Sequence, residues 1–340
     1  MSHVKHLLPP VERYYKANLH THSTISDGTA TPEKLKEAYK AKGYSILAIT
    51  DHDVVADHSN LNDEDFLFLT GAEYDIDEPG KPIRNGHAKA YHLNCIAKQP
   101  NILWQPFANA NVREDVRPYL EKATIESLPR EHTVDAINTI IARANETGHL
   151  VAYNHPVWSL HDYTDYAGLK GLWGVEIFNA GCARCGFGEE GNALVYRDLM
   201  NLTGKVYPLC TDDLHSVRFL GGGWLMVGAQ KLEYSSVICA LEQGNFYAST
   251  GPEIRSLTFD GSFLRVSCSD AREITLVCGT RFKSTVFPIN NDGLMHEAVF
   301  DLSRWLDSWQ DLPQYWFRVQ VKGPYGHYAT TRAYKKEDIV

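Results

Sequence analysis

Histidine and acidic residues with metal-binding spacing are concentrated between residues 18 and 215 of this 340-residue chain. The chain has 15 histidines, and clustered histidines serve metal binding or proton transfer more often than packing. His20 and His22 follow an expected strand, and their alternating spacing projects both side chains from one side of an extended backbone. A His-x-His pair alone is weak support, but it favours chelation of a metal ion.

Nearly all of the other ligand-capable residues lie at the carboxyl end of an expected parallel strand. Those ends converge on one mouth in a β/α barrel, which is where the active site of such a barrel lies. Scattered structural histidines have no reason to share that location. The residues that we expect to join the histidine pair are Asp27, His52, Glu73, His92, His155, Asp213 and His215.

The elements that would position these residues alternate between strand and helix. Thr31 and Pro32 are typical of a helix start, and the helix is expected to reach Lys42 before the stop at Gly43. Alternation of this kind predicts a parallel sheet, closed or open. The expected strands are 45–50, 150–153, 175–178 and 206–210, and the further helices are 133–148 and 191–203.

The pattern changes near residue 250, after the break at Ser249–Pro252. Short alternating strands separated by Gly and Asp turns predict a small antiparallel β-sandwich. We therefore expect a hydrolase-type barrel at 1–252 and an accessory sandwich at 253–340. The expected strands are 254–259, 263–267, 273–277, 284–287, 297–302, 315–321 and 327–334.

The motifs, taken together, resemble the polymerase and histidinol phosphatase family, abbreviated PHP, over about residues 16–250. The stretches Gly221–Trp224 and Gly244–Pro252 are similar to a PHP branch that carries a C-terminal β-sandwich. The resemblance implies a distorted barrel of seven β/α units that holds two or three divalent ions of Zn, Mn or Fe. The motifs that carry it are His20-Thr-His-Ser23 with Asp27-Gly28, Thr50-Asp-His-Asp53, Gly71-Ala-Glu73, Asn154-His-Pro156 and Thr211-Asp-Asp-Leu-His215.

The resemblance also implies a role for each ligand. Asp27 occupies a position that is histidine in some members, which favours Mn²⁺ or Fe²⁺ over zinc there. His87 competes with His92, and the apolar neighbours of His92 favour His92 because they place it in a strand. The implied ligands are His20, His22 and Asp213 for the first metal, Glu73 as a bridge between two metals, His92 and His155 for the second, and Asp27, His52 and His215 for the third.

Several neighbouring residues have less specific interpretations. Asp51 and Asp53 are expected to orient His52 or His20 rather than to bind metal. The same kind of supporting role is expected for Asp212. Glu176 belongs either to the barrel wall or to the site. Trp158 and Tyr153 are expected to pack, and Cys182 and Cys185 to be two thiols in a glycine-rich loop. Arg184 and Arg218 are either phosphate clamps or ordinary surface arginines. The histidines expected to be solvated are His3, His6, His58, His132, His149, His161, His296 and His327.

Charge and composition restrict the function classes. Lys+Arg 33 against Asp+Glu 42 gives a net charge of −9, with no basic block, which disfavours a nucleic-acid polymer as substrate although not a single nucleotide. No apolar run is long enough to span a membrane. The 7 scattered cysteines and the lack of a signal-like segment predict a cytoplasmic protein. The oligomeric state is left open.

The implied metal set predicts hydrolysis by a metal-activated water. Divalent ions would outweigh the three carboxylates among the nine proposed ligands, so the pocket would suit a small phosphorylated substrate. Glu73, Asp213 and His215 would act through that water. We expect a phosphoesterase for a phosphomonoester or small phosphodiester. The alternatives are a PHP-type hydrolase of a non-phosphate ester, carbamate or amide, and a non-catalytic protein that binds a glycan or a partner.

Overall fold

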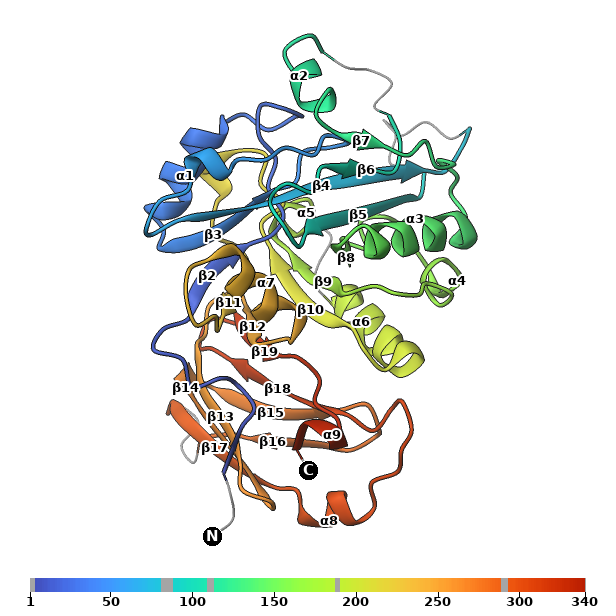
Figure 1. Cartoon of the computed structure of the whole chain (residues 1–340). Coiled ribbons are helices and arrows are strands. Elements are labelled where there is room, and N and C mark those ends of the chain that lie inside the picture. The colour runs from blue at the N-terminus through green and yellow to red at the C-terminus, as the bar shows by residue number, and fades with distance from the viewer. Residues whose placement is uncertain (1–3, 81–87, 109–112, 187–189, 289–292, 340) are drawn as a thin grey trace.

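The computed structural model describes residues 4–80, 88–108, 113–186, 190–288 and 293–339. Within these residues the fold is mixed α/β, with helices packed around the strands of the N-terminal part and mostly antiparallel strands in the C-terminal part (Figure 1). No helix among the described residues is long and apolar enough to cross a membrane. The described fold is therefore mixed α/β with a C-terminal part rich in β-strands.

One 13-stranded sheet runs through both parts of the described chain. Its strands, in spatial order, are β10 (Tyr207–Thr211), β9 (Gly174–Asn179), β8 (His149–Tyr153), β5 (Ala90–Ala97), β4 (Leu67–Asp77), β3 (Tyr44–Ile49), β2 (Tyr15–Asn18), β11 (Trp224–Val227), β12 (Phe246–Ser249), β19 (Tyr328–Thr331), β18 (Phe317–Lys322), β15 (Glu273–Cys278) and β16 (Lys283–Val286).

The N-terminal strands are partly parallel, as expected, but β5, β11 and β12 pair antiparallel with their neighbours. β2, β3 and β4 pair in parallel, as do β8, β9 and β10. β5 is antiparallel to both β4 and β8, which corrects the expectation of a wholly parallel sheet. Asp77 pairs with Ala90, so β4 and β5, which are consecutive in the chain, form an antiparallel pair.

Strands β2 and β10 approach each other, but no ladder of hydrogen bonds joins them among the described residues. Just beyond β2 and β10, Thr21 and Leu214 form one parallel bridge, and the His22 N–H donates to the Leu214 carbonyl at 2.9 Å. A closed barrel therefore remains a prediction. The bridge nevertheless brings the segment that holds His20 and His22 beside the segment that holds Asp213 and His215.

The longer N-terminal helices begin as their capping residues predict. The side chain of Thr31 accepts from the Lys34 N–H, and that of Thr133 from the Ala136 N–H. α1 (Pro32–Lys40) packs on β3, α3 (Val134–Glu146) on β8, and α6 (Glu190–Thr203) on β9. The remaining helices are α2 (Arg117–Leu120), α4 (Tyr163–Tyr166), α5 (Ala180–Arg184), α7 (Tyr234–Glu242), α8 (Ser303–Asp307) and α9 (Lys336–Ile339), with 3₁₀ turns at Ser59–Leu61 and Val217–Phe219.

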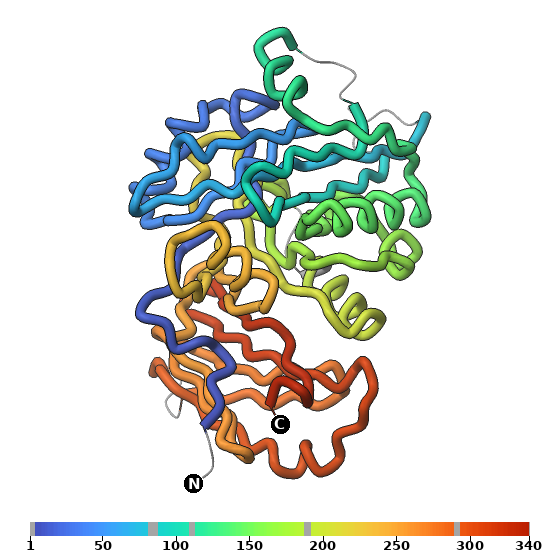
Figure 2. Tube along the Cα trace, in the orientation of Figure 1, coloured from blue at the N-terminus to red at the C-terminus, as the bar shows by residue number. Residues whose placement is uncertain are grey.

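The strands expected beyond residue 253 all have counterparts. A second sheet packs against β15, β18 and β19 around a buried core that includes Leu257, Leu264 and Val319. The N-terminal segment also joins this part, because β1 pairs with β13 (Figure 2). The boundary at residue 252 stays a prediction. The second sheet has the order β1 (Lys5–His6), β13 (Ile254–Phe259), β14 (Phe263–Ala271) and β17 (Met295–Asp301), and a separate pair is formed by β6 (Trp104–Gln105) and β7 (Thr124–Ile125).

Two histidines that we expected to be solvated are buried. His58 is 5% exposed and His149 is 1% exposed, so the expectation is wrong for both. His149 lies at the start of β8 and donates from Nδ1 to the Ala144 carbonyl at 3.2 Å, while its Nε2 is buried without a partner. His6, His296 and His327 are exposed, and His132 and His161 are half-buried. His3 lies outside the described residues.

The buried His149 makes a pH-dependent contribution to stability. Burial lowers its pKa from 6.5 to about 4, because a second ring proton would have no acceptor. The unfolded chain binds that proton near pH 6.5. The contribution of His149 to stability is therefore fully present above this pH and is lost as the pH falls toward 4. The free energy of unfolding falls between about pH 7 and pH 5. We expect this fall to be about 2 kcal/mol smaller in His149→Gln than in the wild type.

Denaturant unfolding at both pH values measures this difference. His296→Gln, which removes an exposed imidazole paired with Asp270, is the matched control and should change the pH dependence much less. Equal pH dependence in wild type and His149→Gln would show that His149 is not held neutral by the fold.

Candidate metal centre

The proposed ligands come from strands and from the segments that follow them. His20 and His22 follow β2, His52 follows β3, His155 follows β8, and Asp213 and His215 follow β10. Glu73 differs from the expected placement, since it does not end its strand and β4 continues to Asp77. His92 lies within a strand, as expected, but this strand, β5, is antiparallel to its neighbours.

Glu73 is the residue around which the cluster is arranged. It is buried, and its two carboxylate oxygens face different imidazoles. Oε2 lies 3.2 Å from His20 Nε2, 3.3 Å from His22 Nε2 and 3.3 Å from His52 Nδ1. Oε1 lies 3.1 Å from His92 Nδ1 and 3.5 Å from His155 Nε2. One carboxylate therefore lies between two sets of imidazole nitrogens.

Asp213 completes one side of the cluster. Its Oδ1 lies 3.1 Å from His22 Nε2 and 3.3 Å from His20 Nε2, and these two ring nitrogens are themselves 3.2 Å apart. Two ring nitrogens and carboxylate oxygens of Asp213 and Glu73 thus converge on a small volume. The donors are the N and O atoms that suit Zn²⁺, Mn²⁺ or Fe²⁺.

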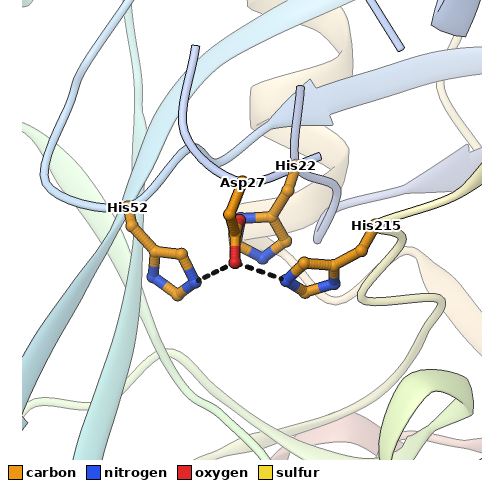
Figure 3. Close-up of side chains that lie close together, drawn as sticks. All are labelled: His22, Asp27, His52 and His215. Atoms are coloured by element: carbon orange, nitrogen blue, oxygen red, sulfur yellow. Dashed lines mark ion pairs between the residues drawn. The ribbon is translucent and has the colours of Figure 1, made fainter. Parts of the chain in front are cut away.

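Asp27 and three histidines form the more exposed side of the cluster. Figure 3 shows Asp27 between His52 and His215, with His22 behind it. Asp27 Oδ2 lies 3.2 Å from His215 Nε2 and 3.8 Å from His52 Nε2, and Asp27 Oδ1 lies 3.6 Å from His22 Nδ1. His22 therefore presents one ring nitrogen to Asp27 and the other to Glu73 and Asp213.

The nine proposed ligands thus lie together, in groupings that differ in part from the implied ones. Asp27, His52 and His215 group together as expected, with His22 added. His92 and His155 fall into different groups, although both face Glu73 Oε1. His87 lies outside the described residues. The groups whose donor atoms lie within 4.8 Å of one another are His22, Asp27, His52 and His215; His52, Glu73, Asp75 and His92; His20, His22 and Glu73; and His20, His155 and Asp213.

Asp75 is a residue of the cluster that the sequence motifs did not predict. Its Oδ1 lies 2.8 Å from His52 Nδ1 and 3.9 Å from His92 Nδ1. Asp75 follows Glu73 by two positions in β4, and alternate residues of a strand share one face. That spacing was the available signal, and it was hidden by the expectation that the strand ends at Glu73.

Glu176, in β9, belongs to the site. It is buried, and its Oε1 accepts from His20 Nδ1 at 2.7 Å and from Thr211 Oγ1 at 2.6 Å. Its Oε2 accepts from the His155 N–H at 2.9 Å. Glu176 therefore fixes the ring of His20 with Nε2 toward Glu73 and Asp213, as carboxylates behind metal-binding histidines do.

The other acidic residues of the motifs hold loops instead of histidines, so their expected role is wrong. Asp51 accepts from the backbone N–H and hydroxyl of both Ser23 and Ser26, at 2.6–3.2 Å. Asp212 accepts from the N–H groups of Gly221–Gly223. Asp53 pairs with Arg130 at 2.8 Å. These contacts fix the segments on which the proposed ligands lie.

Backbone strain is also concentrated here. His155 has φ 25° and Asp213 has φ 48°, a region that residues other than glycine rarely adopt and that often marks functional sites. Gly28 is required for space, since a Cβ there would lie 2.2 Å from the His22 carbonyl oxygen. The surrounding fold thus holds these segments in conformations that local preference disfavours.

The charges of the cluster fit divalent cations. No Lys or Arg within the described ranges pairs with Glu73, Asp75 or Asp213, whose ion partners are all imidazoles. Burial opposes protonation of His20, but Asp213, Glu73 and Glu176 raise its pKa well above the usual value. Burial opposes ionisation of Glu73, but His20, His92 and His52 lower its pKa well below the usual value. Divalent cations can replace those imidazole protons as the balancing charge.

A cavity of about 290 Å³ opens onto the cluster. Trp158 is one wall, with its ring 4.8 Å from that of His155 and 5.4 Å from that of His92, and it is 38% exposed. We had expected it to pack. Cys182 of α5 and Cys185, which follows that helix, line another wall.

The two arginines proposed as phosphate clamps do not line this cavity. Arg184 donates to the Phe219 carbonyl, and both guanidinium groups lie over the Phe219 ring, at 4.9 Å for Arg184 and 4.4 Å for Arg218. A role for them in binding phosphate remains a prediction.

Comparison with known proteins supports the resemblance. Residues 18–151 match the family model of the PHP domain. This segment is similar to a PHP domain. It contains His20, His22, Asp27, His52, Glu73 and His92, while His155, Asp213 and His215 come from the chain beyond it.

Relatives of the PHP domain include a 5'-3' exoribonuclease of Haemophilus influenzae, 35% identical over 72 residues. The match covers 20% of this chain and only 26% of that protein. A two-domain protein of Bacteroides vulgatus containing a predicted PHP-like metal-dependent phosphoesterase is 15% identical, with 97% of this chain and 98% of that chain covered and a TM-score of 0.40. A candidate metal-dependent phosphoesterase of Bifidobacterium adolescentis is 17% identical over 61% of this chain and 89% of that chain, with a TM-score of 0.36.

The position of Glu73 between two sets of imidazoles gives the first test of the candidate metal centre. Glu73→Gln keeps the side-chain volume but removes the charge that both sets of imidazoles face. We expect loss of at least one divalent ion per chain, measured by elemental analysis after reconstitution, and a fall in any metal-dependent rate of about 10²-fold or more.

Asp53→Asn is the matched control, because it makes the same acid-to-amide change at a carboxylate that pairs with Arg130. It should keep its metal. If Asp53→Asn loses the ions while Glu73→Gln retains them, the assignment of Glu73 is wrong.

Proposed function

We propose that this protein is a metal-dependent phosphoesterase that hydrolyses a small phosphomonoester or phosphodiester. The observation that carries the proposal is the buried carboxylate of Glu73, whose two oxygens face separate sets of imidazoles. A carboxylate in that position can bridge two divalent ions. Bound ions of this kind supply a water of lowered pKa and neutralise charge on the reacting phosphate.

The chain's own residues hold and orient this centre. His20, His22 and Asp213 would hold one ion, His92 and His155 a second, and Asp27, His52 and His215 a third, with Glu73 shared. Glu176 keeps His20 Nδ1 occupied at 2.7 Å, and Asp75 does the same for His52 Nδ1 at 2.8 Å. Each therefore leaves Nε2 of its histidine directed into the cluster. The carboxylate of Asp27 favours Mn²⁺ or Fe²⁺ in its group.

The cavity favours a small anionic substrate. Among the described residues that line it there is no Lys or Arg, whereas Asp27, Glu73 and Asp213 are present. Its positive charge must therefore come from bound cations, which attract a phosphate more strongly than a neutral ester. The volume of about 290 Å³ lies at the small end of ligand sites.

The net charge and the cysteines bear on the class of substrate and on the compartment. A net charge of −9 disfavours a long nucleic acid, although the exoribonuclease relative keeps a short RNA among the substrates to test. No disulfide joins the seven cysteines, all of which the structure describes, and this supports a reducing compartment such as the cytoplasm.

A substrate panel tests the proposed reaction. Protein stripped with a chelator should be inactive, and Mn²⁺ or Zn²⁺ should restore hydrolysis of p-nitrophenyl phosphate, sugar phosphates, nucleotides or a dinucleotide, measured as released phosphate or nitrophenol. A carboxylic ester and a carbamate belong in the same panel. Metal-dependent cleavage of the ester or carbamate alone would assign a different bond, and no cleavage by the reconstituted protein would reject catalysis on these substrates.

Trp158 provides a test of the substrate wall. Trp158→Ala removes an aromatic surface beside His92 and His155 without removing a proposed ligand. We expect KM to rise about 10-fold, in line with the loss of one aromatic contact, and the metal content to stay the same. Trp309→Ala, a half-buried tryptophan of the C-terminal part, is the control. A KM unchanged by Trp158→Ala would place the substrate elsewhere.

A further inference from the structure

One face of the C-terminal part of the large sheet is polar. Glu273 and Thr275 of β15 pair with Lys322 and Gln320 of β18, and Val277 pairs with Arg318. Because alternate residues of a strand share one face, these side chains form rows on the same side. The intervening residues, Ile274, Leu276, Val319 and Val321, point the other way and are buried in the second core.

Helix α6 covers this polar face and leaves a space above it. Trp316 Nε1 donates to Asn201 Oδ1 at 2.9 Å, and the Ala333 N–H donates to the Tyr196 hydroxyl at 3.2 Å. These contacts fix α6 beside β18 (Figure 1). Between them lies a cavity of about 400 Å³, lined by Ala193 and Tyr196 from the α6 side and by the polar rows of the sheet.

The charges that line this cavity are unbalanced. Among the described residues that line it, Arg318, Lys283 and Lys322 outnumber the one carboxylate, that of Glu273. None of the four forms an ion pair with another residue that the structure describes, and Glu273 instead accepts from Thr275 Oγ1 at 2.7 Å. The cavity therefore has an excess of positive charge.

Arg318 is the central group of this cavity. It donates from one terminal nitrogen to Thr330 Oγ1 and to Gln320 Oε1, the latter at 3.3 Å, while its Nε is buried and has no hydrogen-bond partner. Arg318 is half-buried, and a partly desolvated guanidinium without a carboxylate partner is costly. Burial accordingly lowers the pKa of Arg318, although nearby Tyr196 opposes the shift. The planar fork of arginine matches the oxygens of a carboxylate or phosphate.

We propose that the cavity between α6 and the polar face of β15, β16 and β18 binds a small molecule through an oxyanion group, a phosphate or a carboxylate, seated on Arg318. Lys283 and Lys322 add positive charge at the exposed side, and Thr275 and Gln320 line it with hydrogen-bonding groups. No proposed metal ligand lines this cavity. The site is thus separate from the metal centre and independent of the reaction proposed for it.

Equilibrium dialysis of the full, metal-loaded chain with radiolabelled inorganic phosphate tests the site, because the metal centre contributes equally in every variant. We expect the wild type to bind one more equivalent of phosphate, or of the dicarboxylate succinate, than Arg318→Gln. The dissociation constant of that equivalent should rise at least about 10-fold on loss of the charged hydrogen bonds. Comparison of phosphate with succinate identifies the oxyanion.

Two further variants keep the result interpretable. Arg265→Gln changes an arginine that pairs with Asp260 on the same domain and should bind like the wild type. Lys322→Gln changes an exposed residue and should weaken binding several-fold, even if Arg318→Gln fails to fold. Equal binding of both anions by wild type, Arg318→Gln and Lys322→Gln would overturn the proposal. Phosphatase activity retained by Arg318→Gln would show that the two sites are separate.

Discussion

The rest of the site depends on one constraint, the buried carboxylate of Glu73. Among the described residues, its ion partners are all imidazoles. Glu73 is 1% exposed, and a buried anion needs compensating charge close by. Strands β2, β3, β5 and β8 each contribute, directly or through the segment that follows, at least one histidine that faces it. The strand order around β4 can therefore be understood as the arrangement that surrounds this carboxylate.

A second group of acidic residues holds the loops on which the histidines lie. Asp51 accepts from Ser23 and Ser26, next to the segment that carries His22 and Asp27. Asp212 anchors Gly221–Gly223 against the segment that carries Asp213. In the Thr211–His215 motif, Asp213 thus faces the cluster while Asp212 satisfies backbone N–H groups. Loss of an anchoring carboxylate would leave buried donors unpaired.

Much of the fold and of the cluster could be predicted because local signals were strong. The caps at Thr31 and Thr133, the alternating strands beyond residue 253 and the position of histidines after strands all correspond to the structure. The direction of β5 could not be predicted, since it depends on which strand Ala90 pairs with and not on its own sequence. Burial of His149 depends likewise on tertiary packing, and the partners of Asp51 and Asp212 lie far along the chain.

Anomalous X-ray scattering from crystals of the metal-loaded protein is the most direct measurement of the central claim. Data collected at the absorption edges of Zn, Mn and Fe would locate each ion and identify it. We expect two or three ions at the cluster, with the two oxygens of Glu73 bound to different ions. A cluster without ions, or ions that leave Glu73 unbound, would contradict the assignment of Glu73 as the bridge of a metal centre.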